Sequence, residues 1–269
     1  MLPPELPPIS NKFLYAYRVF AKWLSFFIFG LSTLVLVIIV FPFMHLVFHP
    51  KERLKKHARR LVSFSMRCFV SLMHFLGVVN VEIDDREKYR NLSSKIIVAN
   101  HPSLLDIVVL FSLIPNADCI VNTALNRNFI VKGVVRHLYI LNSLDIESIF
   151  QSCADSLKQG NCLIIFPEGT RTPRYGKVIL KRGAARFSLY SGCNIVPLHI
   201  GGTDKYGLGK KDPLTGFNPR ERYIYSISMG PEINPEKYRS LSAPKAVRAM
   251  TREMFAFLFP AKEEVKETQ

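Results

Sequence analysis

The sequence predicts an α/β fold with a mostly parallel central sheet flanked by helices, preceded by N-terminal membrane-associated helices. From residue 78 onward, short apolar runs typical of strands alternate with helical stretches, which favours parallel strands covered on both faces. Before that point, residues 23–48 contain no Asp, Glu, Lys or Arg. The 269 residues therefore divide into a membrane anchor (1–77), an α/β domain (78–260) and a polar tail (261–269).

The first predicted element is an apolar helix over about residues 23–48. At about 1.5 Å per residue it would reach roughly 39 Å, more than the roughly 30 Å hydrocarbon core, so a helix that is tilted or kinked at Pro42 fits. A cleaved signal peptide is the alternative, but its apolar core covers only about 7–15 residues. Basic residues lie on both sides of the helix, three before it (Lys12, Arg18 and Lys22) and six after it, within residues 51–60. The larger group is expected to stay cytoplasmic, which places the rest of the chain on the cytoplasmic face. If the apolar segment entered the bilayer only half-way, both flanks would lie on the same side and the charge difference would not indicate an orientation.

The second predicted element is an amphipathic helix over about residues 54–77. Apolar side chains recur there at steps of three and four residues, and basic residues gather at its start. One interpretation is a helix that lies on an anionic bilayer, and its place directly after the spanning segment favours it. The alternative is a helix packed on the protein core.

The α/β domain follows as a series of short elements. The predicted strands are VVNVEI (78–83), KIIVAN (95–100), NCLIIFPEGT (161–170), CNIVPLHI (193–200) and YIYSISMG (223–230). The predicted helices cover residues 103–113, 146–159, 181–191 and 243–259.

The charge and hydrophobicity of the chain indicate which classes of partner it can bind. Lys and Arg number 36 against 21 Asp and Glu, a net charge of +15, which attracts nucleic acid, anionic lipid and anionic substrates alike. The 48% content of hydrophobic residues favours membrane lipids, so no nucleic-acid partner is expected. The five cysteines are scattered without a CxxC pair and indicate free thiols in a reducing compartment. Dispersed histidines predict no metal site, and no Gly-x-Ser-x-Gly elbow or P-loop is present.

The stretch ANHPSLLDIVVL, residues 99–110, joins a buried strand to a helix and contains His101 and Asp106. Inside one helix, side chains five residues apart point about 140° apart. The two side chains can meet only if His101 precedes the helix, and Pro102 forces that break. A carboxylate on one imidazole nitrogen would fix the tautomer and free the other nitrogen as a general base. A capped helix with an incidental histidine is the alternative.

A second strand ends in IIFPEGTRTP, residues 164–173. Gly169 permits close backbone approach, and Arg171 offers a planar fork of donors suited to phosphate or carboxylate. Glu168 can accept hydrogen bonds from substrate hydroxyls, and Thr170 is a further candidate contact. A strand-end turn with a surface arginine is the alternative. In a parallel sheet this turn and the His101 turn open onto the same edge.

These two motifs carry a resemblance to a known family. NHPSLLD is similar to the Asn-His-x-x-x-x-Asp signature of glycerolipid acyltransferases, and FPEGTR to their second signature. The chain resembles the 1-acyl-glycerol-3-phosphate (lysophosphatidate) acyltransferases from about residue 78 to 233, including LKRGAARFSLYSGCNIVPLHIGG. The resemblance implies that residues 78–260 form an acyltransferase domain. That domain would move a fatty acyl group from acyl-CoA or acyl carrier protein to a lysophospholipid acceptor.

The resemblance also implies the roles of the site residues. His101 would take the proton of the acceptor, and Asp106 would orient and stabilise His101. The acceptor would be bound by residues of the second motif, namely Glu168, Gly169, Thr170 and Arg171. Backbone N–H groups near the helix start would hold the oxyanion. The thioester is a co-substrate, and neither a cofactor nor a metal is implied.

The family has one further motif, which ends in an arginine that binds the acceptor phosphate. This sequence departs from the family at that motif. The corresponding stretch covers residues 131–143, where the expected position falls near Asn142 or Ser143. Arg136, Lys181 or Arg182 would have to supply this cation. Otherwise the acceptor carries no phosphate there, as in a specialised pathway of amino-acid lipids or lipid-linked polyenes. A non-catalytic, membrane-anchored basic binding module is the remaining alternative, supported by the charge of residues 51–60.

Overall fold

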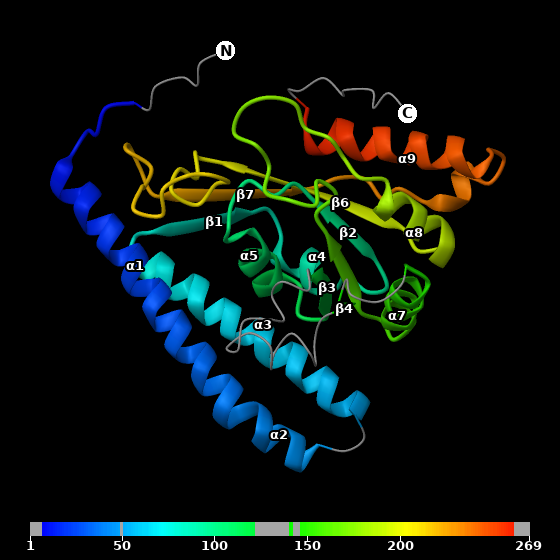
Figure 1. Ribbon diagram of the computed structural model, residues 1–269, viewed down its shortest axis with the longest axis horizontal. Coiled ribbons are helices and arrows are strands. Elements are labelled where there is room, and N and C mark those ends of the chain that lie inside the picture. The colour runs from blue at the N-terminus through cyan, green and yellow to red at the C-terminus, as the bar shows by residue number, and fades with distance from the viewer. Residues whose placement is uncertain (1–6, 49–50, 122–139, 142–145, 261–269) are drawn as a thin grey trace.

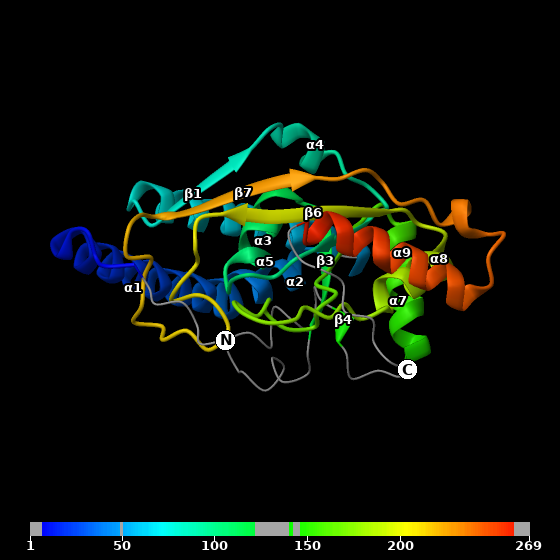
Figure 2. The same ribbon diagram turned by 90° about the horizontal axis from the view of Figure 1, so that it is seen from above.

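The computed structural model describes residues 7–48, 51–121, 140–141 and 146–260. Within them, seven strands form one sheet in the order β1-β7-β6-β2-β5-β3-β4. The strands are β1 (Val79–Ile83), β2 (Ile96–Ala99), β3 (Ala117–Val121), β4 (Ile140–Leu141), β5 (Cys162–Ile165), β6 (Ile195–Gly202) and β7 (Tyr223–Met229). Neighbouring strands are parallel except β6 and β7, and in Figure 2 the β6 arrow opposes those of β1 and β7. The predicted mostly parallel sheet is confirmed.

Helices cover both faces of this sheet (Figure 1). On one face lie α1 (Lys12–Val35), α3 (Lys51–Phe75) and α5 (Asp106–Leu113), and on the other lie α7 (Ile146–Lys158), α8 (Gly183–Ser191) and α9 (Ala243–Leu258). Strand β2 is buried throughout. Its alternate residues enter the two cores, Ile97 and Ala99 on the α5 side and Ile96 and Val98 on the α9 side. Burial on both faces explains the unbroken apolar runs of the sequence.

Four short elements were not predicted: β3, β4, the helix α4 (Arg86–Arg90) and a 3₁₀ helix at Pro235–Tyr238. β3 begins with Ala117 and Asp118, and its polar second residue hides the apolar pattern of a buried strand. Asp118 is nevertheless only 2% exposed, because Arg59 of α3 donates two hydrogen bonds to it. Tertiary pairing thus makes a strand from a sequence that does not indicate one.

The N-terminal helix is longer than predicted. α1 continues through a π-turn at Leu36–Val40 into α2 (Phe41–Val47). Asn11 caps its start by accepting the N–H of Leu14 at 3.0 Å. Among the described residues, Lys12–Val47 is the one helix long and apolar enough to cross a membrane. Large apolar side chains are exposed along its whole length, which suits membrane association.

The same helix is also fixed to the α/β domain. Lys22 has no exposed surface, and its Nζ donates to the carbonyls of Leu214 and Gly216 at 2.5 Å each. Ala21 belongs to the same hydrophobic core as the sheet. Beyond this attachment, Phe26 and Phe29 still pack against the same core, and Phe41 and Met44 of α2 pack against α3 (Figure 1).

The apolar stripe of α3 corrects one expectation. Phe69 and Met73 are buried in the core beneath the sheet, and Ala58 and Val62 are buried against α2. The prediction that this stripe faces a bilayer is wrong, because protein already covers it. Residues on both sides of the predicted boundary at 77 therefore share one hydrophobic core.

Candidate active site

The site is built around His101, which follows β2 at the carboxyl edge of the sheet. Helix α5 begins at Asp106, later than the predicted start at residue 103, so His101 lies outside the helix. Its Nδ1 is 2.8 Å from Oδ2 of Asp106. The structure thus brings together the two side chains that the sequence paired, in the way that Pro102 requires.

Asp106 is fully buried and oriented from several directions. Its Oδ2 also accepts the N–H of Ser103 at 2.7 Å, and its Oδ1 accepts the Ser103 hydroxyl at 2.5 Å. The Ser103 hydroxyl lies 2.7 Å from the hydroxyl of Tyr225, a fully buried β7 residue. Because Oδ2 acts as an acceptor for the histidine, it selects the tautomer with the proton on Nδ1. Nε2 is then left as the basic nitrogen.

The second motif supports the histidine from the other side. The ring of Phe166 stacks on the His101 imidazole with centroids 4.1 Å apart. The backbone N–H of His101 is shared between Oε1 of Glu168 at 3.1 Å and the Thr172 hydroxyl at 3.0 Å. Glu168 is 7% exposed, and its Oε1 also accepts the Thr172 hydroxyl at 2.7 Å. One carboxylate oxygen of Glu168 therefore has a structural role in positioning His101.

The other residues of this motif lie at the end of β5. Gly169 has a φ of +66°, and a Cβ added there would lie 2.6 Å from Nζ of Lys181. The Lys181 side chain thus packs over the glycine. Thr170 is exposed. Arg171 donates through Nη1 to the carbonyls of Leu208 and Gly209, each at 2.9 Å.

Three N–H groups near the helix start already have acceptors in this arrangement. The N–H of Ser103 donates to Asp106, that of Leu104 to the Leu208 carbonyl, and that of Leu105 to the Ser103 hydroxyl. These bonds close the turn between His101 and α5. Which N–H groups near the helix start would hold an oxyanion stays a prediction.

Sequence reasoning missed Lys205, which lies behind Asp106. Its Nζ is 4.7 Å from the centre of the Tyr225 ring and donates to the carbonyls of Gly201, Thr203 and Ile224. Burial lowers the pKa of Lys205 to about 8, and the negative charge of Asp106 partly opposes this shift. The loop after β6 gives no sequence signal for such burial.

Lys205 and Thr172 also line a cavity of about 260 Å³ next to His101. Its wall includes Arg174, whose guanidinium is paired with Asp204 and Asp212, and the exposed Lys210. The residues singled out for the missing arginine, Asn142 and Ser143, lie outside the described residues, as does Arg136.

Comparison with known proteins decides the family. The Acyltransferase family model matches residues 80–201. The 1-acyl-sn-glycerol-3-phosphate acyltransferase of Helicobacter pylori is 30% identical over 213 residues, which cover 76% of this chain and 83% of that protein. The chain belongs to the 1-acyl-sn-glycerol-3-phosphate acyltransferase family. This confirms the resemblance seen in the two motifs.

Two further acyltransferases are similar to this chain. The chloroplastic enzyme of Arabidopsis thaliana is 30% identical over 64% of this chain, and the chain spans 48% of that protein's length. The crystal structure of the 1-acyl-sn-glycerophosphate (LPA) acyltransferase PlsC from Thermotoga maritima has the same fold. Its TM-score is 0.66 at 20% identity, covering 93% of this chain and all of that one.

Proposed function

We propose that this protein transfers a fatty acyl group from acyl-CoA or acyl carrier protein to a lysophospholipid similar to 1-acylglycerol 3-phosphate. Membership of the acyltransferase family supports the reaction class. The observation that carries the proposal is the contact of 2.8 Å between His101 and the buried Asp106, at the sheet edge shared with the FPEGTR turn.

The proposed chemistry needs no covalent enzyme intermediate. Nε2 of His101 takes the proton of the acceptor hydroxyl while its oxygen attacks the thioester carbonyl carbon. The buried carboxylate of Asp106 stabilises the imidazolium that forms. The tetrahedral intermediate then collapses, the carbon–sulfur bond breaks, and the leaving sulfur receives the proton from His101. An ester and a free thiol result.

The proposed acceptor site is the turn after β5, with Glu168, Gly169, Thr170 and Arg171. Arg171 and Lys181 supply the positive charge for the acceptor phosphate, and the position of Lys181 over Gly169 supports this assignment. Lys181 would then replace the arginine that is missing near Asn142. The exposed hydroxyl of Thr170 is available to the same ligand.

The proposed location is a membrane, with the α/β domain on its cytoplasmic face. The long apolar helix Lys12–Val47 supports membrane association. The basic residues 51–60 after that helix support the orientation.

The departure at Asn142 and Ser143 favours a second candidate, the same acyl transfer to an acceptor without a phosphate group. One experiment separates the candidates. Purified protein in detergent receives labelled acyl-CoA or acyl carrier protein and a panel of lysophospholipid and lyso-aminolipid acceptors, and mass spectrometry identifies the product.

We expect acylated lysophosphatidate from the wild type and no product from His101→Ala. A lyso-aminolipid product would replace the first candidate with the second. Absence of transfer with every donor and acceptor would refute both, and duplex DNA binding with a steep salt dependence would then identify a basic binding module.

A further inference from the structure

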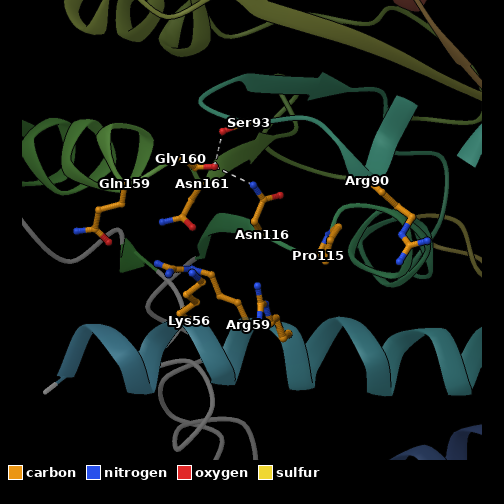
Figure 3. A pocket seen from close by; sticks show the side chains of 10 residues that line it. Lys56, Arg59, Arg90, Ser93, Pro115, Asn116, Gln159, Gly160 and Asn161 are labelled. Atoms are coloured by element: carbon orange, nitrogen blue, oxygen red, sulfur yellow. Dashed lines mark hydrogen bonds between the residues drawn. The ribbon is translucent and has the colours of Figure 1, made fainter. Parts of the chain in front are cut away.

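A second hollow, unrelated to the His101 site, lies between α3 and the opposite edge of the sheet (Figure 3). Its volume is about 590 Å³. Its lining comprises Lys56, Arg59, Arg60, Arg90, Ser93, Pro115, Asn116, Gln159, Gly160 and Asn161. The neutral members of that set come from the loops before β2, β3 and β5, whereas His101 follows the far end of β2. Four residues of β2 separate the two sites, about 13 Å of strand.

The walls of this hollow are basic on the helix side and neutral on the loop side. In Figure 3, Lys56 and Arg59 extend from α3 toward Asn116 and Asn161. The loop wall is held in place by hydrogen bonds, because the Gly160 carbonyl accepts from Ser93 at 3.0 Å and from Asn116 at 2.8 Å. A preformed polar wall facing cations is suited to a small anion.

The positive charge in the hollow is only partly neutralised. Arg59 binds Asp118 through Nε and Nη2 at 2.6 and 2.8 Å, which leaves Nη1 outside that ion pair. Arg90 pairs with Glu87 at 2.9 Å. Among the described residues, no carboxylate lies within ion-pair distance of Lys56 or Arg60. Lys56, Arg59 and Arg60 are three and four residues apart on one helix, where like charges repel one another.

We infer that this hollow, the α3 pocket, binds a phosphate group. Lys56 and Arg60 provide charge that is not paired with any carboxylate of the described residues. Arg59 offers its remaining nitrogen, and Asn161 is a neutral group at the wall that is only 8% exposed. Several oxygens on one anion can bind these donors at once, and charge-assisted hydrogen bonds to phosphate are among the strongest. The inference is independent of the acyltransferase reaction, since it uses no residue of the His101 site.

Two sources of the phosphate group fit the position of the pocket. A phospholipid headgroup fits because the exposed apolar rod of α1 and α2 packs on the first turns of α3 through Phe41 and Met44. A soluble phosphate fits because Lys56 and Arg60 are open to solvent.

The test compares two double variants of the full chain that lose the same charge. Lys56→Gln with Arg60→Gln changes the α3 pocket. Lys245→Gln with Arg248→Gln changes exposed positions of α9, on the other face of the sheet. One arm titrates detergent-solubilised protein with inorganic phosphate by calorimetry. The other compares flotation with phosphatidylcholine vesicles with and without phosphatidylglycerol.

We expect wild type and the α9 variant to bind equally in at least one arm, and the pocket variant to bind about tenfold more weakly, a loss of about 1.4 kcal/mol. The arm that responds identifies the source of the phosphate. Absence of binding by the wild type in both arms, or equal losses in the two variants, would overturn the inference. Thermal melts check that each variant folds. If the double variant does not fold, the single variants K56Q and R60Q are measured in its place.

Discussion

The sharpest test of the proposed mechanism is Asp106→Asn, which removes a charge and preserves a shape. In the wild type, Oδ2 accepts two hydrogen bonds, from His101 Nδ1 and the Ser103 N–H, and Oδ1 accepts one from the Ser103 hydroxyl. An asparagine can keep its oxygen at the Oδ2 position and place its amide on the Ser103 hydroxyl, which also accepts hydrogen bonds. The tautomer and orientation of His101 are then retained, and only the negative charge is lost.

The size of the effect follows from that charge. The carboxylate stabilises the imidazolium that forms in the proposed transition state, with charge centres about 4 Å apart. At an effective dielectric constant near 20, opposite unit charges at about 4 Å attract by about 4 kcal/mol. Since about 1.36 kcal/mol changes a rate tenfold, Asp106→Asn should lower kcat by about 10³-fold.

The assay measures acyl transfer from labelled acyl-CoA to 1-acylglycerol 3-phosphate by purified protein in detergent, at saturating donor and acceptor. The matched control is Asp155→Asn, which makes the same change at an exposed aspartate of α7 and should keep the wild-type kcat. A folded Asp106→Asn enzyme with kcat within tenfold of wild type would refute the assignment of Asp106 as the group that stabilises His101.

Three further substitutions test the site. His101→Ala should abolish transfer by a protein that still folds, because it removes the proposed base; product formation above background would contradict the role of His101. Gly169→Ala should destabilise the protein by about 1–2 kcal/mol through its φ of +66° and raise KM for the acceptor by displacing Lys181, which thermal melts and kinetics check against wild type. Lys205→Met tests burial of the ammonium, whose pKa falls from 10.5 to about 8 on folding. Between these pH values the unfolded chain binds more protons, so wild-type stability should gain up to about 3 kcal/mol as pH rises, a gain that melts of the variant should lack.

Much of the fold was accessible from the sequence because both faces of the central strands are buried. IIVA at 96–99 and CLII at 162–165 are unbroken apolar runs, and such runs need no long-range information to be recognised. β3 was not accessible, since its Asp118 becomes compatible with a buried strand only when Arg59 of α3 reaches it. Pairing between residues 59 positions apart leaves no local pattern.

The apolar stripe of α3 is a second feature whose surroundings the sequence did not predict. Its helical periodicity was evident, yet periodicity does not say whether the apolar side meets lipid or protein. The structure places Phe69 and Met73 beneath the sheet. Where the stripe packs depends on the position of α5 and α2, which only the folded chain sets.

The sequence by itself determined that His101 and Asp106, the proposed catalytic pair, meet. Pro102 between His101 and the helix forces the break that lets the histidine turn back onto Asp106, and this is a local steric effect. The tertiary structure decided what surrounds the pair. Ser103, Tyr225 and Lys205 come together behind Asp106 because β7 and the loop after β6 pack there, and the oxygen Oε1 of Glu168 is occupied by the His101 backbone. A local steric effect depends only on residues that are neighbours in the sequence. The burial of a side chain and the charges around it depend on every segment that the fold brings near.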